Sequence, residues 1–125
     1  MITTDKLIYL AGPYSFNPKK AFARHMAYAA ALMNKGLFVF SPILHNHQLA
    51  HAHKLPTDSE FWKIHNKQMI LRCDELWVMI EPGWWQSKGT QYEISIAAEA
   101  GKLATYVMLD GDSFCVFSSH VCTHY

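Results

Sequence analysis

The sequence predicts an α/β fold in which helices wind on both sides of a mainly parallel sheet. Short apolar runs alternate with longer segments of helical periodicity along most of the chain. The apolar runs end near glycine, proline or serine, as buried strands do where they enter loops. Strand, helix and strand in succession form right-handed parallel crossovers, so we expect a doubly wound, flavodoxin-like or Rossmann-like sheet.

Length and composition limit the class of protein. The 125 residues, half of them hydrophobic and 17% charged, suit a single globular domain spanning 1–125. The net charge of +1 argues against a general binder of nucleic acid polymers or membrane surfaces. No apolar run approaches the roughly 20 residues of a membrane span, and the N-terminus lacks the pattern of a signal peptide. Three cysteines at no metal-like spacing fit a reduced, cytoplasmic protein.

The first half of the chain predicts strand, helix and strand. Residues 7–11 form an apolar run that ends at Gly12, and 37–40 form a second one. Between them, Asn17 and Pro18 fit a helix cap and a first helical residue. The apolar residues at helical spacing that we expect to face the core are Phe22, Met26, Ala29, Ala30 and Met33.

A polar segment from Ser41 to Ser59 follows and contains four histidines. We interpret it as a flexible loop over the ligand site. A zinc site is the alternative, but no cysteine or carboxylate accompanies the histidines as zinc sites usually require, so we expect no metal and no cofactor. His45, nearest to the end of the strand, is the histidine that we place near a ligand.

The second half repeats the alternation. Asp58 or Ser59 fits the cap of a second helix that extends to about Arg72. Its expected core stripe is Phe61, Ile64 and Leu71, with Trp62 and Met69 beside it. Residues 75–80 predict a third strand, a third helix begins near Thr90, and 103–109 predict a fourth strand. We expect that helix to pack through Ile94, Ala97 and Ala98. Residues 114–117 fit a short further strand, and the last residues show no clear pattern.

The stretch from Trp84 to Glu93 is the centre of the predicted site. It lies between the third strand and the third helix, and open α/β sheets bind ligands at the carboxyl ends of their strands. It offers an indole (Trp84), a hydroxyl (Ser87), a flexible backbone point (Gly89) and a carboxylate (Glu93). Thr90 and Glu93 also fit a capping box, in which Glu93 would only cap the helix.

The loop after the first strand should face this stretch. Ser15, Lys19 and Arg24 lie near the start of the first helix, where free amides and the helix dipole favour a phosphate. A solvated basic helix face is the alternative interpretation.

With these motifs in place, the chain resembles the nucleoside 2-deoxyribosyltransferase-like proteins, which include deoxynucleoside 5′-monophosphate N-glycosidases. The resemblance covers nearly the whole chain, and its motifs are Ile8 to Ser15, Ser41-Pro42-Ile43, Cys73 to Val78, and Gly83-Trp84 with Ser87-x-Gly89-x-x-Tyr92-Glu93. It implies a doubly wound parallel sheet, a small nucleotide or nucleoside as substrate, and a homodimer or higher homo-oligomer.

The resemblance also implies roles for individual residues. Glu93 matches the nucleophile that attacks the anomeric carbon of deoxyribose, and Tyr9 matches a tyrosine that orients it. Ser87 and the loop containing Gly12, Tyr14 and Ser15 match the residues that hold a 5′-phosphate.

Asn66 departs from the family pattern, because the family usually has an aspartate there that is thought to protonate the leaving base or position the sugar. An amide forms hydrogen bonds but supplies no proton. Three alternatives follow: another group is the acid, the leaving base needs little help, or the chain binds without turnover. The candidates for another acid are His65, His45 and Asp58. The leading hypothesis is an N-glycosidase acting on a 2′-deoxynucleoside 5′-monophosphate. A deoxyribosyltransferase and a nucleotide-binding module without catalysis are the alternatives, the latter favoured by Asn66.

Overall fold

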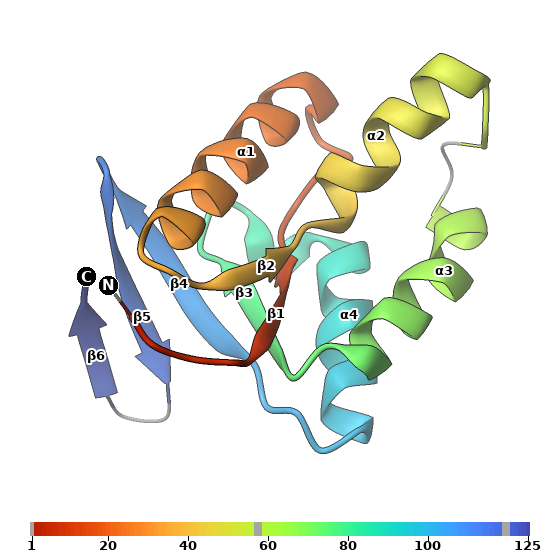
Figure 1. Cartoon of the computed structure of the whole chain (residues 1–125). Helices are drawn as coiled ribbons and strands as arrows, with labels where there is room; N and C mark the ends of the chain where they lie inside the picture. The colour runs from red at the N-terminus through yellow and green to blue at the C-terminus, as the bar shows by residue number, and fades with distance from the viewer. Residues whose placement is uncertain (1, 57–58, 119–120) are drawn as a thin grey trace.

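The structure is a computed structural model that describes residues 2–56, 59–118 and 121–125. Its centre is a sheet of six strands in the order β2-β1-β3-β4-β5-β6 (Figure 1). The strands are β1 (Leu7–Ala11), β2 (Phe38–Phe40), β3 (Glu75–Met79), β4 (Thr105–Asp110), β5 (Ser113–Ser118) and β6 (Val121–His124). The helices are α1 (Pro18–Asn34), α2 (Pro42–His53), α3 (Ser59–Arg72) and α4 (Lys88–Glu99), with a short 3₁₀ helix, η1 (Trp84–Gln86).

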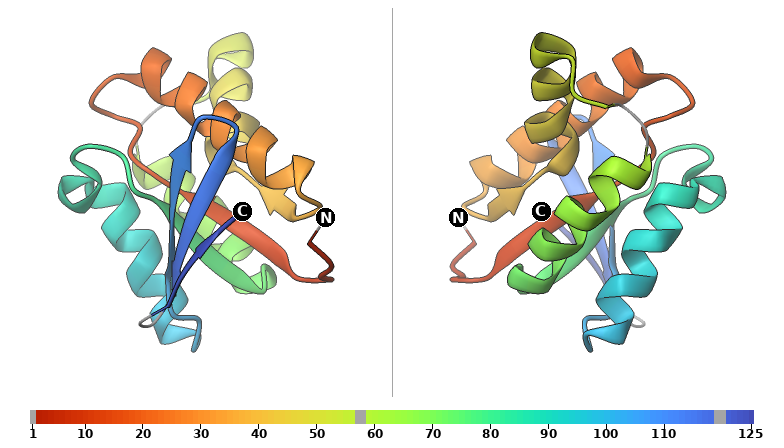
Figure 2. Two further views of the ribbon diagram at one scale, coloured as in Figure 1. Left: turned by 90° about the vertical axis from the view of Figure 1, so that its left-hand side faces the viewer. Right: turned by 90° about the vertical axis from the view of Figure 1, so that its right-hand side faces the viewer.

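The first four strands form the parallel part of the sheet. β1 pairs in parallel with β2 and with β3, and β3 pairs in parallel with β4. Figure 2 shows α1 and α4 on opposite sides of this sheet. The predicted α/β, doubly wound fold is therefore confirmed.

Each side of the sheet has its own hydrophobic core. On one side, Ile8 and Leu10 of β1 pack with Tyr28 and Leu32 of α1. On the other side, alternate residues of the same strand, Tyr9 and Ala11, lie in a cluster with residues of α3 and α4, including Ile70 and Ala97. The alternation follows from the two-residue period of a strand. It directs Tyr9 toward α4, where the candidate site lies.

The sheet continues beyond β4 with antiparallel strands. β5 pairs with β4 and β6 pairs with β5, so the final residues, for which the sequence showed no clear pattern, include a strand. Phe114 and Val116 of β5 are buried on the side of α1. Within the described ranges, no helix has the length and apolar character required to cross a membrane.

The segment from Ser41 to Ser59 corrects the sequence analysis. It is not a flexible loop throughout, because α2 occupies Pro42–His53. Ser41 caps this helix by accepting a hydrogen bond from the Leu44 amide (3.3 Å), and Pro42 is its first residue. A serine followed by a proline fits the start of a helix as well as the end of a strand. The serine can cap the helix, and proline lacks the backbone N–H that the first turn would leave unpaired. The predicted cap at Asp58 lies outside the described residues.

The buried faces of three helices also differ from the prediction. In α1 the buried residues are His25, Tyr28, Ala29 and Leu32, whereas Met26, Ala30 and Met33 are exposed. In α3 the expected stripe is largely exposed, with 75% of Ile64 accessible, and Ile70 is buried instead. Ala98 of α4 is exposed, and Ile96 takes its place in the core. Apolar residues lie on more than one face of these helices, so spacing alone did not identify the face that meets the sheet.

Candidate active site

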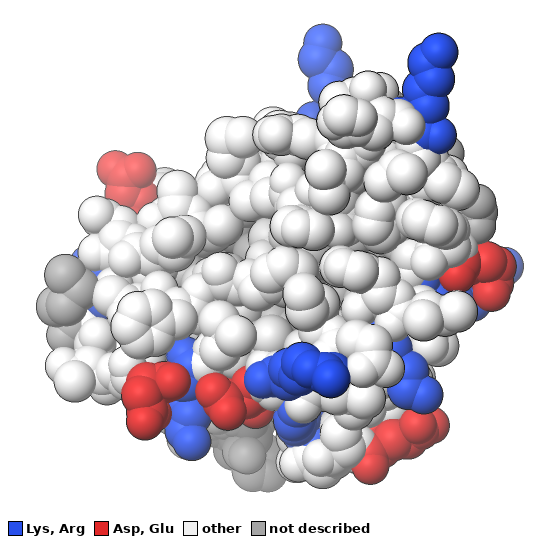
Figure 3. Space-filling model, turned by 45° about the vertical axis from the view of Figure 1, so that its right-hand side comes forward, with Lys and Arg blue, Asp and Glu red and all other residues white. Residues whose placement is uncertain are grey.

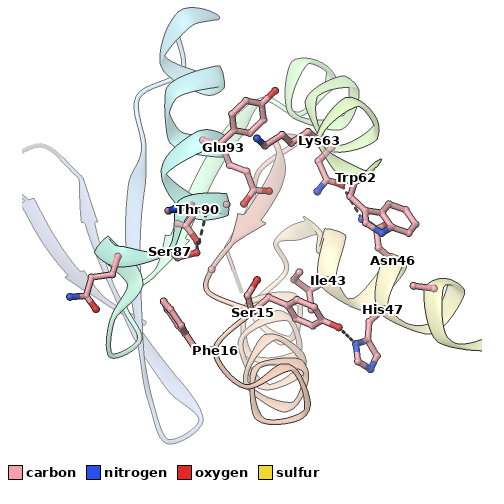
Figure 4. A pocket seen from close by; sticks show the side chains of 18 residues that line it. Ser15, Phe16, Ile43, Asn46, His47, Trp62, Lys63, Ser87, Thr90 and Glu93 are labelled. Carbon is pink, nitrogen blue, oxygen red and sulfur yellow. Dashed lines mark hydrogen bonds between the residues drawn. The ribbon is translucent and has the colours of Figure 1, made fainter. Parts of the chain in front are cut away.

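A pocket of about 400 Å³ opens at the carboxyl ends of β1 and β3. Figure 4 shows Glu93 pointing into it from α4, with Asn46 and His47 of α2 on another wall. On the face seen in Figure 3, charged side chains gather toward the edges and few lie near the middle. The pocket is lined by Gly12, Tyr14, Ser15, Phe16, Ile43, Asn46, His47, Ala50, Trp62, Lys63, Asn66, Gln86, Ser87, Lys88, Gly89, Thr90, Tyr92 and Glu93.

Glu93 is the buried carboxylate of this pocket, with 9% of the residue exposed. The Tyr9 hydroxyl donates a hydrogen bond to its Oε2. Burial raises the pKa of Glu93 to about 7, although the hydrogen bond from Tyr9 acts in the opposite direction. Burial and the nearby Glu93 raise the pKa of Tyr9 well above 10, so the phenol remains a donor. Glu93 therefore changes charge near neutral pH.

The start of α4 decides between the two interpretations of Glu93. Ser87 is the cap, and its Oγ accepts hydrogen bonds from the Thr90 amide (3.3 Å) and the Thr90 hydroxyl (2.9 Å). The helix begins at Lys88, so Glu93 lies in the second turn and bonds to Tyr9. The capping-box interpretation with Thr90 as cap is wrong. Burial is the largest influence on the ionisation of Glu93 and raises its pKa.

The loop after β1 forms the floor of the pocket. Gly12 is packed so closely that an added Cβ would lie 2.9 Å from Sδ of Met79 and 3.2 Å from Cε1 of His25. His25 is fully buried and its Nε2 donates to the Pro13 carbonyl (3.2 Å). Burial lowers the pKa of His25 to about 4, so it stays neutral at pH 7. These contacts hold the loop that carries Tyr14 and Ser15 into the pocket.

The wall formed by α2 carries residues that sequence analysis missed. Ile43, Asn46, His47 and Ala50 line the pocket at the 3–4-residue spacing of one helix face. Tyr14 and His47 form a hydrogen bond between the Tyr14 hydroxyl and Nδ1 of His47. Had Ser41-Pro42 been interpreted as a helix start, this spacing would have selected His47 rather than His45.

His45 is exposed and does not line the pocket. Its ring stacks on His65 with 5.7 Å between centroids, and its Nδ1 lies 2.8 Å from Oδ1 of Asn46. Asn46 in turn donates from Nδ2 to Oδ1 of Asn66 (3.0 Å). At this point the pocket is lined by Asn46 and Asn66, whose hydrogen bond joins α2 to α3, and not by His45.

Two further predicted residues, Arg24 and Trp84, do not line the pocket of Glu93. Arg24 lines a smaller neighbouring pocket of about 240 Å³ and pairs with Glu81 through two contacts of 2.7 and 3.1 Å. Burial opposes the ionisation of Glu81, but the hydrogen bonds from Arg24 and Tyr28 lower its pKa below the usual value. The ring of Trp84 packs against Tyr106, with 5.3 Å between centroids. The other predicted site residues are brought together: Gly12, Tyr14, Ser15, Asn66, Ser87, Gly89 and Glu93 line the pocket, and Tyr9 lies directly beneath it against Glu93.

Among the described residues, no group of three or more histidine, cysteine, aspartate or glutamate side chains could hold a metal ion. The arrangement instead offers a buried carboxylate, aromatic rings, amides and the start of a helix.

The mainly parallel sheet and the comparisons with known proteins place this chain in the deoxyribosyltransferase-like class. Residues 6–108 match the family described as "Domain of unknown function (DUF1937)", and the chain belongs to that family. Among solved structures it is similar to a 2-desoxiribosyltransferase from Leishmania mexicana. The two share 27% identity over 84% of this chain and 65% of that one, with a TM-score of 0.57, so this chain spans less than two thirds of the other's length. A search of curated proteins found no match. The resemblance to deoxyribosyltransferase-like proteins is confirmed.

Proposed function

We propose that this protein cleaves the N-glycosidic bond of a 2′-deoxynucleoside 5′-monophosphate. Glu93 attacks the anomeric carbon, C1′, and the base departs, leaving the sugar as an ester of Glu93. Water then opens this ester and regenerates the carboxylate. Such double displacement divides a difficult substitution into two easier steps, as in retaining glycosidases.

The observation that carries the proposal is the position of Glu93. Its carboxylate lies at the wall of the pocket and is held from behind by Tyr9, so that its direction is set by β1 and α4. A group held by two packed elements keeps the alignment that nucleophilic attack requires. Because its pKa is about 7, a large share of Glu93 is ionised at neutral pH and ready to attack.

The start of α4 supports a phosphorylated substrate. Ser87, Lys88, Gly89 and Thr90 line the pocket at a helix N-terminus, where backbone amides and the helix dipole favour an anion. Ser15 lies in the loop after β1 and lines the same pocket. Arg24, which is paired with Glu81, has no part in this proposal.

The wall formed by α3 supports a base at the opposite end of the ligand. Trp62 and Asn66 are four residues apart, so they share one face of the helix, and both line the pocket. An indole offers a stacking surface and an amide offers hydrogen bonds, the two interactions by which proteins hold an unpaired base.

A deoxyribosyltransferase is the second candidate, because the similar solved structure bears that name. It differs only in that a second base, rather than water, opens the ester of Glu93. A homodimer or higher homo-oligomer stays a prediction of the sequence resemblance.

The test is chromatographic detection of free base from a panel of deoxynucleoside and ribonucleoside 5′-monophosphates, with and without a second base. We expect release by the wild type and a loss of several orders of magnitude in Glu93→Gln, with binding retained in calorimetry. Glu99→Gln, an exposed change on the same helix, is the control. Absence of release from every monophosphate would reject the proposal. Exchange that exceeds hydrolysis would favour the transferase.

A further inference from the structure

Two amide side chains meet at the wall of the pocket that faces the proposed base. Asn46 of α2 and Asn66 of α3 both line the pocket, and Nδ2 of Asn46 donates to Oδ1 of Asn66 (3.0 Å). Asn46 is buried, with 6% exposed. This contact fixes the side chain of Asn66 from a second helix, so its position does not depend on a bound ligand.

The direction of the hydrogen bonds determines which atoms remain for a ligand. Nδ1 of His45 lies 2.8 Å from Oδ1 of Asn46, and an amide oxygen only accepts, so His45 donates there. Asn46 then donates to the oxygen of Asn66. The oxygen of Asn66 is thus engaged, while its Nδ2 has no hydrogen bond to any residue in the described part of the chain. Asn66 therefore offers N–H groups to a ligand.

We infer that Asn66 is a fixed hydrogen-bond donor to the departing base, which leaves as an anion stabilised by this amide rather than as a protonated molecule. The inference rests on the proposed function. The C1′–nitrogen bond breaks as the bond from the Glu93 oxygen to C1′ forms, and the electron pair stays on the base. The base takes a proton from water after it has left. A preorganised donor aimed at developing negative charge is an effective form of electrostatic catalysis.

Two neighbouring donors have partners of their own. Nζ of Lys63 lies 2.7 Å from Glu60 and above the ring of Tyr92. The Tyr14 hydroxyl is bonded to His47. Burial and the neighbouring His51 lower the pKa of His47, so its ring is mainly neutral at pH 7 and is a poor source of a proton.

This arrangement selects a class of base. A base leaves most readily as an anion when its ring N–H is acidic. The N–H donor of Asn66 also needs an acceptor atom on the base, next to the glycosidic nitrogen. Pyrimidine-diones have both features, because a carbonyl oxygen flanks that nitrogen and shares the charge. We therefore assign the site to 2′-deoxynucleoside 5′-monophosphates of this class, ahead of those whose base must be protonated to leave.

The experiment measures single-turnover release from 2′-deoxyuridine 5′-monophosphate and its 5-methyl, 5-bromo and 5-fluoro derivatives, whose bases differ in acidity. For the wild type we expect the rate to rise with the acidity of the base. Asn66→Ala removes the donor and should slow base release from every substrate of the series by about 10²-fold, as the loss of one such donor does in other enzymes. The rate should also depend more steeply on the acidity of the base. Asn46→Asp leaves Asn66 in place, but the new carboxylate accepts a hydrogen bond from Nδ2 of Asn66. The oxygen of Asn66 then faces the ligand, so this variant should also release the base more slowly than the wild type.

Gln68→Glu is the matched control, since it makes the same amide-to-carboxylate change on an exposed position of α3. A wild-type rate that is independent of base acidity would overturn the inference while leaving the glycosidase intact, and so would unchanged rates in both variants. The wild-type series needs no variant to fold. No release from this series, together with release of base from another deoxynucleoside 5′-monophosphate, would also overturn the inference. No release from any monophosphate would instead reject the proposed function itself.

Discussion

The Tyr9 hydroxyl donates a hydrogen bond to Oε2 of Glu93 and thereby joins the middle of β1 to the second turn of α4. The two residues are 84 positions apart in the sequence, and Tyr9 is completely buried. Glu93 therefore has a fixed donor on one side and the pocket on the other. Its ionisation depends on the balance between burial and this single hydrogen bond.

The first prediction concerns the pH dependence of base release. A nucleophilic Glu93 must be ionised, and burial raises its pKa to about 7. We expect single-turnover rates to rise between pH 5 and pH 8 with a midpoint near 7, and to fall as Glu93 becomes protonated below it. Rapid-quench measurements on one monophosphate would check this. A rate that is already maximal at pH 5 would contradict it.

The second prediction concerns Tyr9→Phe. The hydrogen bond from Tyr9 lowers the pKa of Glu93, so its removal should shift the midpoint of the rate profile to higher pH and lower the rate at pH 7. Tyr106→Phe, which alters a tyrosine packed against Trp84, is the control and should leave the midpoint unchanged. A downward shift in Tyr9→Phe would show that Tyr9 does not stabilise the carboxylate.

The third prediction concerns stability in Glu93→Gln. The pKa of Glu93 is about 7 in the folded state and near 4.5 when exposed, so between these values the folded state retains a proton that the unfolded state has lost. Stability therefore falls as the pH rises through this window and stays lower above it. Glutamine does not titrate, so the variant should be the more stable protein at pH 8 by at least about 1 kcal/mol, or roughly 4 °C in melting temperature.

Thermal unfolding at pH 5 and pH 8 would measure this difference, with Glu99→Gln as the control at an exposed position of the same helix. The gain should shrink toward pH 5. An equal effect at both pH values would mean that the titration of Glu93 is not linked to folding.

Features that depend on neighbouring residues could be predicted from the sequence more readily than those that depend on residues far apart in the chain. β1 was predicted at its observed bounds because an apolar run that ends at Gly12 depends only on neighbouring residues. The meeting of the β1 and β3 loops follows from the parallel topology, so Gly12, Ser15, Ser87 and Glu93 could be expected together. The Tyr9–Glu93 pair came from the family resemblance rather than from spacing.

The α2 wall could not be predicted in the same way. Ser41-Pro42 fits a strand end and a helix start equally well, and the choice between them depends on packing against α1 and β1. Because the sequence predicts a loop here, it gives no basis for expecting the contacts of Asn46 and His47. The pairing of Arg24 with Glu81 was also hidden, because the partners are 57 residues apart.

The fourth prediction compares two helix caps. Ser87→Ala and Asn17→Ala each remove a side chain that accepts a hydrogen bond from the first turn of its helix, so each should cost about 1 kcal/mol. Only Ser87 lines the pocket of Glu93. We expect only Ser87→Ala to reduce the preference for a monophosphate over its nucleoside, as measured by kcat/KM. An equal reduction in both variants would indicate a general loss of structure.

The fifth prediction concerns the floor of the pocket. A Cβ at Gly12 would lie 2.9 Å from Sδ of Met79, so Gly12→Ala must displace Met79 or the strand end. Such overpacking costs about 1–3 kcal/mol, and it should lower the midpoint of urea unfolding. Gly89→Ala is the matched control, because nothing lies within 4 Å of its added Cβ and alanine favours the helix. The control should be neutral or stabilising. If the two variants were equally stable, the close packing beneath Gly12 would not constrain the loop that carries Tyr14 and Ser15.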